Sequence, residues 1–225
     1  MGLLARLRGD VGDEWEGYVR HRFVLGLGDG SLPEAAFRHF LQQDYLFLIQ
    51  FARAYALAGF KSGSLAELRA ASASVAAIVD VEMPLHVAYC AGWGLSEAQM
   101  EAEPEALETL AYTRFVLDCG LGGDRLDLEV ALAPCVVGYG EAVERLLADP
   151  ATLREGNPYA AWMEAYASPE YRTVVAATVK NLDRLRAARG SEARYPGLLK
   201  IFAAATQLET EFWDMGWRAG GTVME

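Results

Sequence analysis

The sequence predicts an all-α fold, a single-domain bundle of about eight helices. Apolar residues recur at helical spacing along most of the chain, and capping residues, prolines and glycines separate these runs. The connections between the runs are short, and the chain contains no low-complexity linker or internal repeat. With 225 residues, 52% of them apolar, the chain is long enough to bury one large core. We therefore expect one helical domain over residues 1–225.

Local signals set the predicted boundaries of the helices. Ser31 and Glu34 have the spacing of a capping box, and Pro33 suits the first turn of the helix that follows. Ser64 and Glu67 repeat the same signature. An amphipathic stretch near the N-terminus and a short turn before residue 168 complete the set. The eight predicted segments are 15–25, 31–59, 64–90, 104–120, 124–148, 158–166, 168–190 and 195–218.

Composition and charge argue against several classes of function. Thirty-one acidic and twenty basic residues give a net charge of −11, which disfavours nucleic acids and anionic membranes as partners. The three cysteines, Cys90, Cys119 and Cys135, form no CxxC pair and indicate neither a zinc site nor a disulfide framework. No uncharged apolar run approaches about 18 residues, and the first apolar patch is too short for a signal peptide. We expect a cytoplasmic protein.

Asp44 is an ionisable residue on a helix face that should be buried. At about 100° per residue it lies within about 20° of Phe37, at the centre of the apolar stripe of its helix. The other members of this stripe are Leu41, Leu48, Phe51 and Tyr55. A lone carboxylate in such a place destabilises the protein strongly unless it finds hydrogen-bond donors. Asp44 is therefore either a structural residue bonded to a neighbouring helix or part of a polar site.

Glu209 shows the same anomaly in the last predicted helix. It falls among the apolar residues Leu198, Phe202, Ala205 and Phe212. Desolvation raises the pKa of a buried carboxyl group, and a raised pKa is what a general acid needs at neutral pH. Because there are two such carboxyl groups, a purely structural explanation is less satisfactory.

Cys135 shares an apolar face with Leu128, Leu132, Tyr139 and Leu146. A buried cysteine is ordinarily a small hydrophobic residue. The preceding Pro134 removes a helical hydrogen bond and is expected to kink the helix beside the thiol. A freed carbonyl and a widened groove next to a thiol indicate a candidate site.

Glu82 and His86 are four residues apart, on the face of Val75, Val79 and Tyr89. We interpret them as a hydrogen-bonded structural pair. The chain has only three histidines and one E-x-x-x-H motif, so we predict no metal site.

Several motifs occur in order along nearly the whole chain. They are H-R-F-V-L-G-L-G-D-G-S-L-P from His21 to Pro33, F-x-x-F-L-Q-Q-D-Y from Phe37 to Tyr45, Glu82-x-x-x-His86, Ala111-Tyr112-Thr113, Pro134-Cys135-x-x-Gly138-Tyr139, Asn157-Pro158-Tyr159 with Trp162 and Tyr166, and Leu208-Glu209-x-x-Phe212-Trp213. Each block alone is a weak signal, but the set is specific. By these motifs the chain resembles the thiaminase II family, also called TenA.

The resemblance implies a haem-oxygenase-like helical bundle that forms a homotetramer, with an enclosed pocket and neither metal nor cofactor. It implies hydrolysis of small pyrimidines of the thiamin type. The favoured substrate is 4-amino-5-aminomethyl-2-methylpyrimidine, whose conversion to hydroxymethylpyrimidine serves thiamin salvage, and thiamin cleavage is the second activity.

The resemblance also implies roles for individual residues. Cys135 adds to the pyrimidine ring as the nucleophile, Glu209 donates and accepts the proton, and Asp44 holds the amino-pyrimidine edge. The pocket is lined by Phe47, which stacks on the ring, and by Tyr112, Tyr139 and Tyr166. In the family the position of Phe47 is often tyrosine, so a hydroxyl contact is missing here.

Other interpretations stay open at this point. A haem-binding relative of the same fold would use His21 as an axial ligand and would absorb in the blue-violet. A regulator would need a basic face or a helix-turn-helix, and neither is evident in the sequence. A pyrimidine-binding protein without catalysis would bind the ligand and never convert it.

Overall fold

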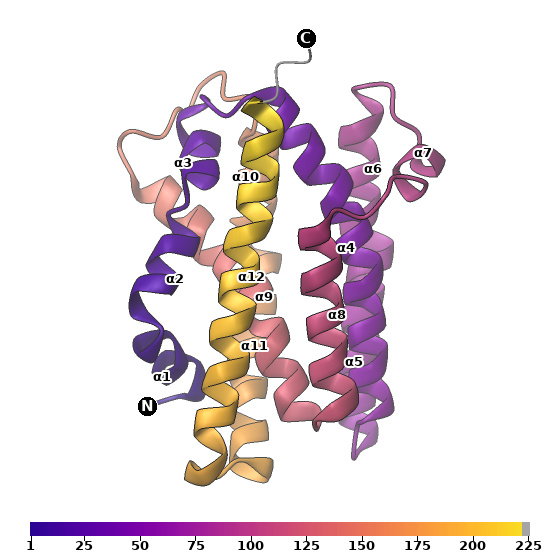
Figure 1. The fold of residues 1–225 in the computed structure, drawn as a ribbon, viewed down its shortest axis with the longest axis vertical. Helices are drawn as coiled ribbons and strands as arrows, with labels where there is room; N and C mark the ends of the chain where they lie inside the picture. The colour runs from indigo at the N-terminus through magenta and orange to yellow at the C-terminus, as the bar shows by residue number, and fades with distance from the viewer. Residues whose placement is uncertain (222–225) are drawn as a thin grey trace.

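A computed structural model describes residues 1–221 and confirms the all-α prediction (Figure 1), with no strand among these residues. The last four residues of the predicted domain, 222–225, lie outside the described residues. In chain order the helices are α1 (Leu3–Asp10), α2 (Gly12–Val19), α3 (Arg22–Asp29), α4 (Glu34–Phe60), α5 (Leu65–Ala77), the π-helix η1 (Ile78–Glu82), α6 (Met83–Ala91), α7 (Glu97–Glu101), α8 (Leu107–Gly122), α9 (Arg125–Ala148), α10 (Ala160–Tyr166), α11 (Pro169–Arg189), the 3-10 helix η2 (Glu192–Arg194) and α12 (Tyr195–Gly221).

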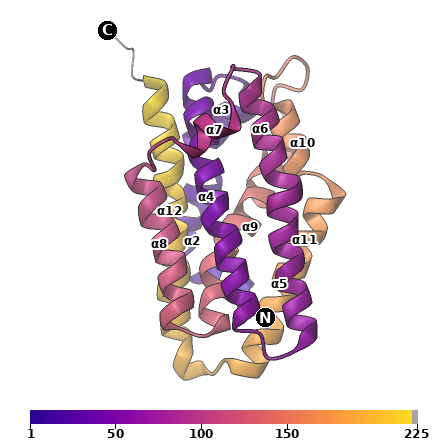
Figure 2. The ribbon, with the colours of Figure 1, turned by 90° about the vertical axis from the view of Figure 1, so that its right-hand side faces the viewer.

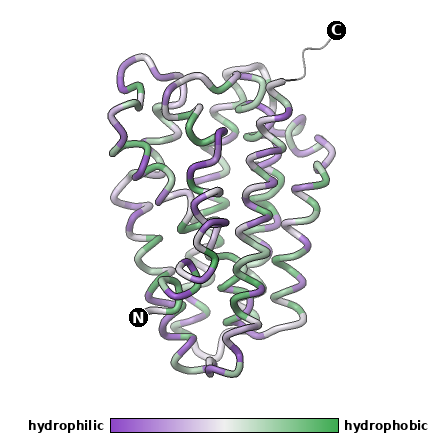
Figure 3. The backbone as a smooth tube through the Cα atoms, turned by 60° about the vertical axis from the view of Figure 1, so that its left-hand side comes forward, coloured by the Kyte–Doolittle hydropathy of each residue, from purple (hydrophilic) through white to green (hydrophobic). Residues whose placement is uncertain are grey.

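Four long helices form the centre of the bundle. The last helix, α12, packs against α4, α8 and α9, with α1 to α3 on one side of it and α4 and α8 on the other (Figure 1). The outer helices are α5, η1 and α6, which pack on α4, and α11, which packs on α9 (Figure 2). Apolar and polar residues alternate along these helices (Figure 3), so the apolar stripes face one shared core.

The N-terminal region differs from the sequence prediction. The amphipathic stretch 15–25 is not one helix, because the chain breaks at Arg20 and restarts as α3. His21 produces this restart, since its imidazole Nδ1 accepts a hydrogen bond of 3.2 Å from the backbone N–H of Phe23. The predicted capping box of Ser31 is also absent, and the N-cap of α4 is Pro33, without a side-chain bond. The other predicted capping residue, Ser64, does cap α5, and Asp124, the first residue of the predicted segment 124–148, caps α9.

One long column consists of α5, η1 and α6, where the sequence predicts a single helix over 64–90. The π-helix leaves Ile78 buried and turns Val79 outward, with 47% of Val79 exposed, so the predicted place of Val79 on the inner face is wrong. By length and composition alone, Leu65–Ala91 is apolar enough to cross a membrane, although only 17% of its most apolar window is buried. The sequence expectation counts uncharged runs, and this window differs because a few separated charges do not lower its average hydropathy much.

Candidate active site

Three side chains that the sequence singles out come from three inner helices and meet inside the bundle. They are Asp44 on α4, Cys135 on α9 and Glu209 on α12. Asp44 is 4% exposed and Glu209 is 1% exposed, as the apolar stripes predict. The Cys135 thiol lies beside the Glu209 carboxyl group, and the carboxyl group of Asp44 lies close enough to influence both of them. The arrangement combines a thiol with several carboxyl groups in one apolar enclosure.

Glu209 has the environment of a general acid. Burial raises its pKa to about 8, while contacts with Tyr112, Cys135 and Tyr18 limit the rise. The Tyr112 hydroxyl donates to Glu209 Oε1 at 2.7 Å. The carboxyl group is therefore mostly protonated at neutral pH and can donate a proton to a bound molecule.

The thiol of Cys135 is not activated in the free protein. Cys135 keeps some exposure as a residue, but burial and then the charge of Glu209 raise the pKa of its thiol well above the ordinary value. Helix α9 continues through Pro134, which cannot donate a hydrogen bond to the turn before it. A reaction at this sulfur needs a group that takes the thiol proton as the new bond forms, and Glu209 lies in contact with it.

Asp44 forms an ion pair with His86, which lies on α6. His86 Nε2 is 2.7 Å from Asp44 Oδ2, and His86 Nδ1 is 3.0 Å from the backbone oxygen of Glu82. Both neighbours accept hydrogen bonds, so both ring nitrogens donate. Burial alone would lower the pKa of His86, but the hydrogen bond and charge of Asp44 outweigh it and the pKa rises to about 9.

The predicted structural pair of Glu82 and His86 is thus only partly correct. Their contact joins the His86 ring to the Glu82 backbone, whereas the Glu82 side chain accepts a hydrogen bond of 3.1 Å from the Tyr166 hydroxyl. Burial raises the pKa of Glu82, with Asp44 adding to the rise and His86 opposing it. Sequence spacing indicates that the two residues are close, but it does not indicate that His86 reaches Asp44.

All four predicted pocket aromatics are buried around these groups. The ring centroids of Phe47 and Tyr112 lie 5.0 Å apart, near Glu209, and those of Tyr139 and Tyr166 lie 5.2 Å apart. Burial and then the charges of Glu209 and Asp44 raise the pKa of Tyr139 well above its ordinary value, because Tyr139 lies near both carboxyl groups. The site is thus enclosed by rings that can stack on a flat ligand.

Tyr18 is a site residue that sequence reasoning missed. Its hydroxyl donates to the Pro134 backbone oxygen at 3.2 Å and lies near Glu209. Gly138 makes room for the Tyr18 ring, because a Cβ atom there would lie 2.1 Å from Tyr18 Cε1. The only sequence signal for this contact is the glycine one turn after Cys135.

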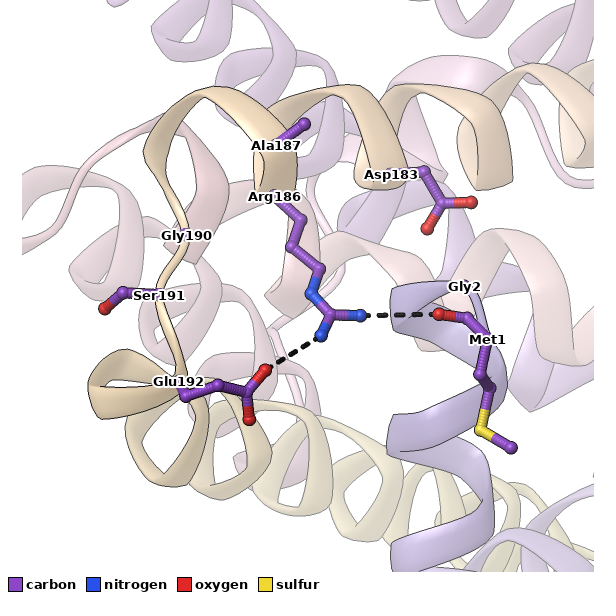
Figure 4. Close-up of a pocket in the computed structure, with 8 residues that line it drawn as sticks. All are labelled: Met1, Gly2, Asp183, Arg186, Ala187, Gly190, Ser191 and Glu192. Atoms are coloured by element: carbon purple, nitrogen blue, oxygen red, sulfur yellow. Dashed lines mark hydrogen bonds and ion pairs between the residues drawn. The ribbon is translucent and has the colours of Figure 1, made fainter.

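Two other features do not form a competing site. A surface hollow of about 480 Å³ lies between the N-terminus and the end of α11 (Figure 4). Its charged side chains already have partners, because Arg186 donates to Glu192 and Asp183 accepts a hydrogen bond from the Leu3 N–H. Both ring nitrogens of His21 are also engaged, one as the cap of α3 and one 3.3 Å from Asp214. Within residues 1–221 no cluster of three or more metal-ligating side chains occurs.

We expect His86→Gln to destabilise the protein in a way that depends on pH. Because the folded pKa of His86, about 9, lies above the unfolded value near 6.5, its pairing stabilises the fold fully below pH 6.5 and less as pH rises through 9. The free energy of unfolding of the variant should be lower by about 2 kcal/mol at pH 6 and closer to wild type at pH 9. Denaturant titrations at both pH values test this.

The matched control for this variant is His39→Gln. Burial lowers the pKa of His39, so its removal should not produce a deficit that shrinks as pH rises. A His86→Gln deficit that is equal at pH 6 and pH 9 would contradict the ion pair.

Comparisons with known proteins agree with this architecture. A sequence profile of the TENA/THI-4/PQQC family matches residues 10–219. An aminopyrimidine aminohydrolase from Halalkalibacterium halodurans is 38% identical over 205 residues, which cover 90% of each chain. The solved structure of a TenA family transcription regulator from Silicibacter sp. TM1040 is 43% identical, with a TM-score of 0.90 over 96% of each chain. A Shewanella denitrificans domain of unknown function with a haem-oxygenase-like fold is 14% identical, with a TM-score of 0.74 over 96% of this chain and 92% of that one, and it shares the fold.

Proposed function

The chain belongs to the TENA/THI-4/PQQC family, and from this premise we propose that it is an aminopyrimidine aminohydrolase that serves thiamin salvage. The substrate we propose is 4-amino-5-aminomethyl-2-methylpyrimidine, with thiamin as a second substrate. The observation that carries the proposal is the buried contact of Cys135 with Glu209 beside the ion pair of Asp44 and His86. It combines a nucleophile, a protonated acid and a charged group for recognising an amino-pyrimidine.

The proposed reaction uses one proton relay. The Cys135 sulfur bonds to a ring carbon as a ring C–N double bond opens, and Glu209 gives its proton to the ring nitrogen while it receives the thiol proton. The ring, no longer aromatic, expels the protonated exocyclic amine as ammonia, and the positive charge stays on the ring and its 4-amino group. Water then adds to the exocyclic carbon and releases a proton, which the ammonia takes up. The relay then runs in reverse: the ring nitrogen gives its proton to Glu209, Glu209 gives one to the sulfur, and breaking of the C–S bond restores the aromatic ring. The net change is amine plus water to alcohol plus ammonia.

Ammonia release from the aminomethylpyrimidine, measured beside thiamin cleavage, tests the proposed function. Turnover of the aminomethylpyrimidine supports it, and the ratio of the two rates identifies the main substrate. If neither compound is turned over while hydroxymethylpyrimidine still binds, the protein is a binding protein and the proposal is wrong.

We expect Asp44→Ala to weaken pyrimidine binding more than any step of the chemistry. A charged hydrogen bond inside a dry pocket contributes about 2–4 kcal/mol, so the Kd for hydroxymethylpyrimidine should rise by about 30- to 1,000-fold. Calorimetric titration measures this Kd. Asp44→Asn keeps the shape of the side chain and should give a Kd between those of wild type and Asp44→Ala. Normal binding by the alanine variant would make Asp44 a structural partner of His86 only.

The remaining properties belong to the same proposal. We place the protein in the cytoplasm as a homotetramer that binds neither nucleic acid nor membranes. The net charge of −11 supports the lack of nucleic-acid binding, and three free cysteines suit a reducing compartment. Light scattering during size-exclusion chromatography measures the number of chains.

A further inference from the structure

Two tyrosine hydroxyl groups donate to backbone oxygens on either side of Cys135. The Tyr18 hydroxyl donates to the Pro134 oxygen at 3.2 Å, and the Tyr171 hydroxyl donates to the Val136 oxygen at 2.9 Å. The two tyrosines come from different helices, α2 and α11, and both of these helices pack against α9. The turn of α9 over residues 134–138, which we call the cysteine turn, is therefore bonded to two neighbouring helices.

The two bonds reach the cysteine turn from opposite sides. Consecutive residues of an α-helix are about 100° apart, so positions 134 and 136 are about 200° apart and position 135 lies between them. Cys135 itself lies beside Glu209 in the interior. A bond on each flank of the cysteine therefore opposes rotation of this turn in both directions.

Glycines make room for both tyrosine rings. In an α-helix each of the two bonded carbonyls also accepts the N–H group four residues further on, and here those residues are Gly138 and Gly140. A Cβ atom at Gly138 would lie 2.1 Å from Tyr18 Cε1. A Cβ atom at Gly140 would lie 3.2 Å from Val175 Cγ2 and 3.4 Å from Tyr171 Cε1. The same arrangement, a glycine one turn after the bonded carbonyl with a tyrosine ring packed over it, thus occurs twice around the cysteine.

The helix has lost one of its own bonds at this place. Pro134 has no N–H group, so the Val130 carbonyl, four residues earlier, lacks its ordinary helical partner. Helix α9 nevertheless continues through the proline. The bonds from Tyr18 and Tyr171 add restraint from the neighbouring helices at the point where the helix itself is weakened.

The chemistry that we propose depends on where the sulfur lies. Reacting atoms must approach to about 3–3.5 Å with the right orientation, and a displacement of about 1 Å can lower a rate about 100-fold. The Cys135 thiol is protonated in the free protein, so it must also stay beside Glu209 to lose its proton as the new bond forms. Rotation of the cysteine turn would disturb both requirements together.

We propose that Tyr18 and Tyr171 are positioning residues, which restrain the cysteine turn and so hold the Cys135 sulfur where it reaches both the pyrimidine and Glu209. The inference rests on the proposed function, which supplies the nucleophile that is positioned. Each tyrosine acts through the backbone of α9 and needs no contact with the substrate. Because Tyr18 also lies near Glu209, whereas the Tyr171 hydroxyl bonds to the backbone, Tyr171 gives the more direct test.

Tyr171→Phe and Tyr18→Phe remove the hydroxyl groups and keep the rings. Each should lower kcat for ammonia release from the aminomethylpyrimidine about 10- to 100-fold. The Kd for hydroxymethylpyrimidine should stay within about threefold of wild type, because the groups that hold the ring are unchanged. Loss of one hydrogen bond should lower the Tm by about 2–4 °C. A merely structural role would weaken stability and binding without this selective loss of kcat.

Hydrogen exchange measures the restraint without any turnover. In both variants the amides of residues 136–140 should exchange about fivefold faster or more, relative to the amides of residues 142–148 in the same helix. The matched control is Tyr159→Phe, since the buried Tyr159 hydroxyl also donates to a backbone oxygen, that of Leu32 on the loop between α3 and α4. This control should alter neither kcat nor the exchange pattern of α9.

The possible outcomes separate this inference from the proposed function. The inference is wrong if both variants keep the wild-type kcat, if pyrimidine binding is lost in parallel with kcat, or if exchange over residues 136–140 does not rise. If wild type releases no ammonia and cleaves no thiamin, the proposed function fails. The exchange comparison then decides alone whether the two hydroxyl groups restrain the cysteine turn.

Discussion

Cys135→Ser should abolish turnover, with a fall in kcat of more than about 1,000-fold, while hydroxymethylpyrimidine binding stays within about tenfold of wild type. Serine keeps the size of the side chain but is a far weaker nucleophile toward a ring carbon, and its proton is harder to remove. The ion pair of Asp44 and His86, which holds the pyrimidine in our proposal, lies on other helices and is not altered. Ammonia release and calorimetric binding measure the two effects separately.

The other two cysteines provide the controls. Cys119, on α8, is partly exposed, and Cys90, on α6, is buried in the core. Burial raises the pKa of both thiols to about 11, and it is Cys135 that lies beside Glu209, the group that takes the thiol proton. Cys119→Ser should retain activity. Full activity of Cys135→Ser would contradict covalent catalysis and leave general acid catalysis by Glu209 as the mechanism to test.

The difficulty in this chemistry is that both reacting groups hold a proton in the free enzyme. The thiol pKa is raised well above its ordinary value, and the Glu209 pKa is about 8. A preformed thiolate is therefore not the source of reactivity at neutral pH. The closeness of the two groups permits the proton exchange that the addition needs, because the carboxyl group can give one proton and accept another within a single step.

The sequence predicts the burial of two carboxyl groups in this candidate site, for a definite physical reason. A carboxyl group on an apolar helical stripe is costly, so Asp44 and Glu209 stand out against the periodicity of their helices, and both are buried in the structure. Cys135 gives a weaker signal, since a cysteine fits an apolar face. The resemblance to a known family places its thiol in the site, and the structure brings it to Glu209.

What the sequence does not predict depends on contacts between distant helices. The bond from His86 to Asp44 joins residues 42 positions apart, and the π-helix that precedes α6 has no simple sequence signature. The contact of Tyr18 with the turn after Cys135 likewise depends on how α2 packs against α9. Helical periodicity identifies which face of a helix is buried, but it does not identify the partner on the next helix.

The predicted helix boundaries are wrong where a local side-chain hydrogen bond interrupts a helix that the apolar periodicity would continue. The stretch 15–25 is amphipathic throughout, yet the His21 ring caps a new helix and interrupts the first one. Histidine is an uncommon cap, so the sequence pattern favours the continuous helix. After this break, both ring nitrogens of His21 have partners: Nδ1 accepts from the Phe23 N–H, and Nε2 lies close to Asp214. Neither nitrogen is therefore free to bind a haem iron.

Glu209→Gln should lower kcat by about 100- to 10,000-fold and change pyrimidine binding by less than about tenfold. The amide keeps the shape and can still accept from Tyr112, but it cannot exchange protons with the ring or the thiol. In wild type, kcat/KM should fall as pH rises through about 8, where Glu209 loses its proton. The small residual activity of the variant should lack this descending limb.

Stability measurements on the same variant provide an independent check of the Glu209 pKa. Between the ordinary glutamate pKa of 4.5 and about 8, the folded protein holds a proton at Glu209 that the unfolded chain has lost, so wild-type stability falls as pH rises through this window. The neutral amide does not titrate, and the variant should gain stability relative to wild type from pH 5 to pH 8. Glu211→Gln, an exposed change on the same helix, should alter neither rate nor this difference. If Glu209→Gln loses binding and keeps its kcat, Glu209 recognises the substrate and another group supplies the proton.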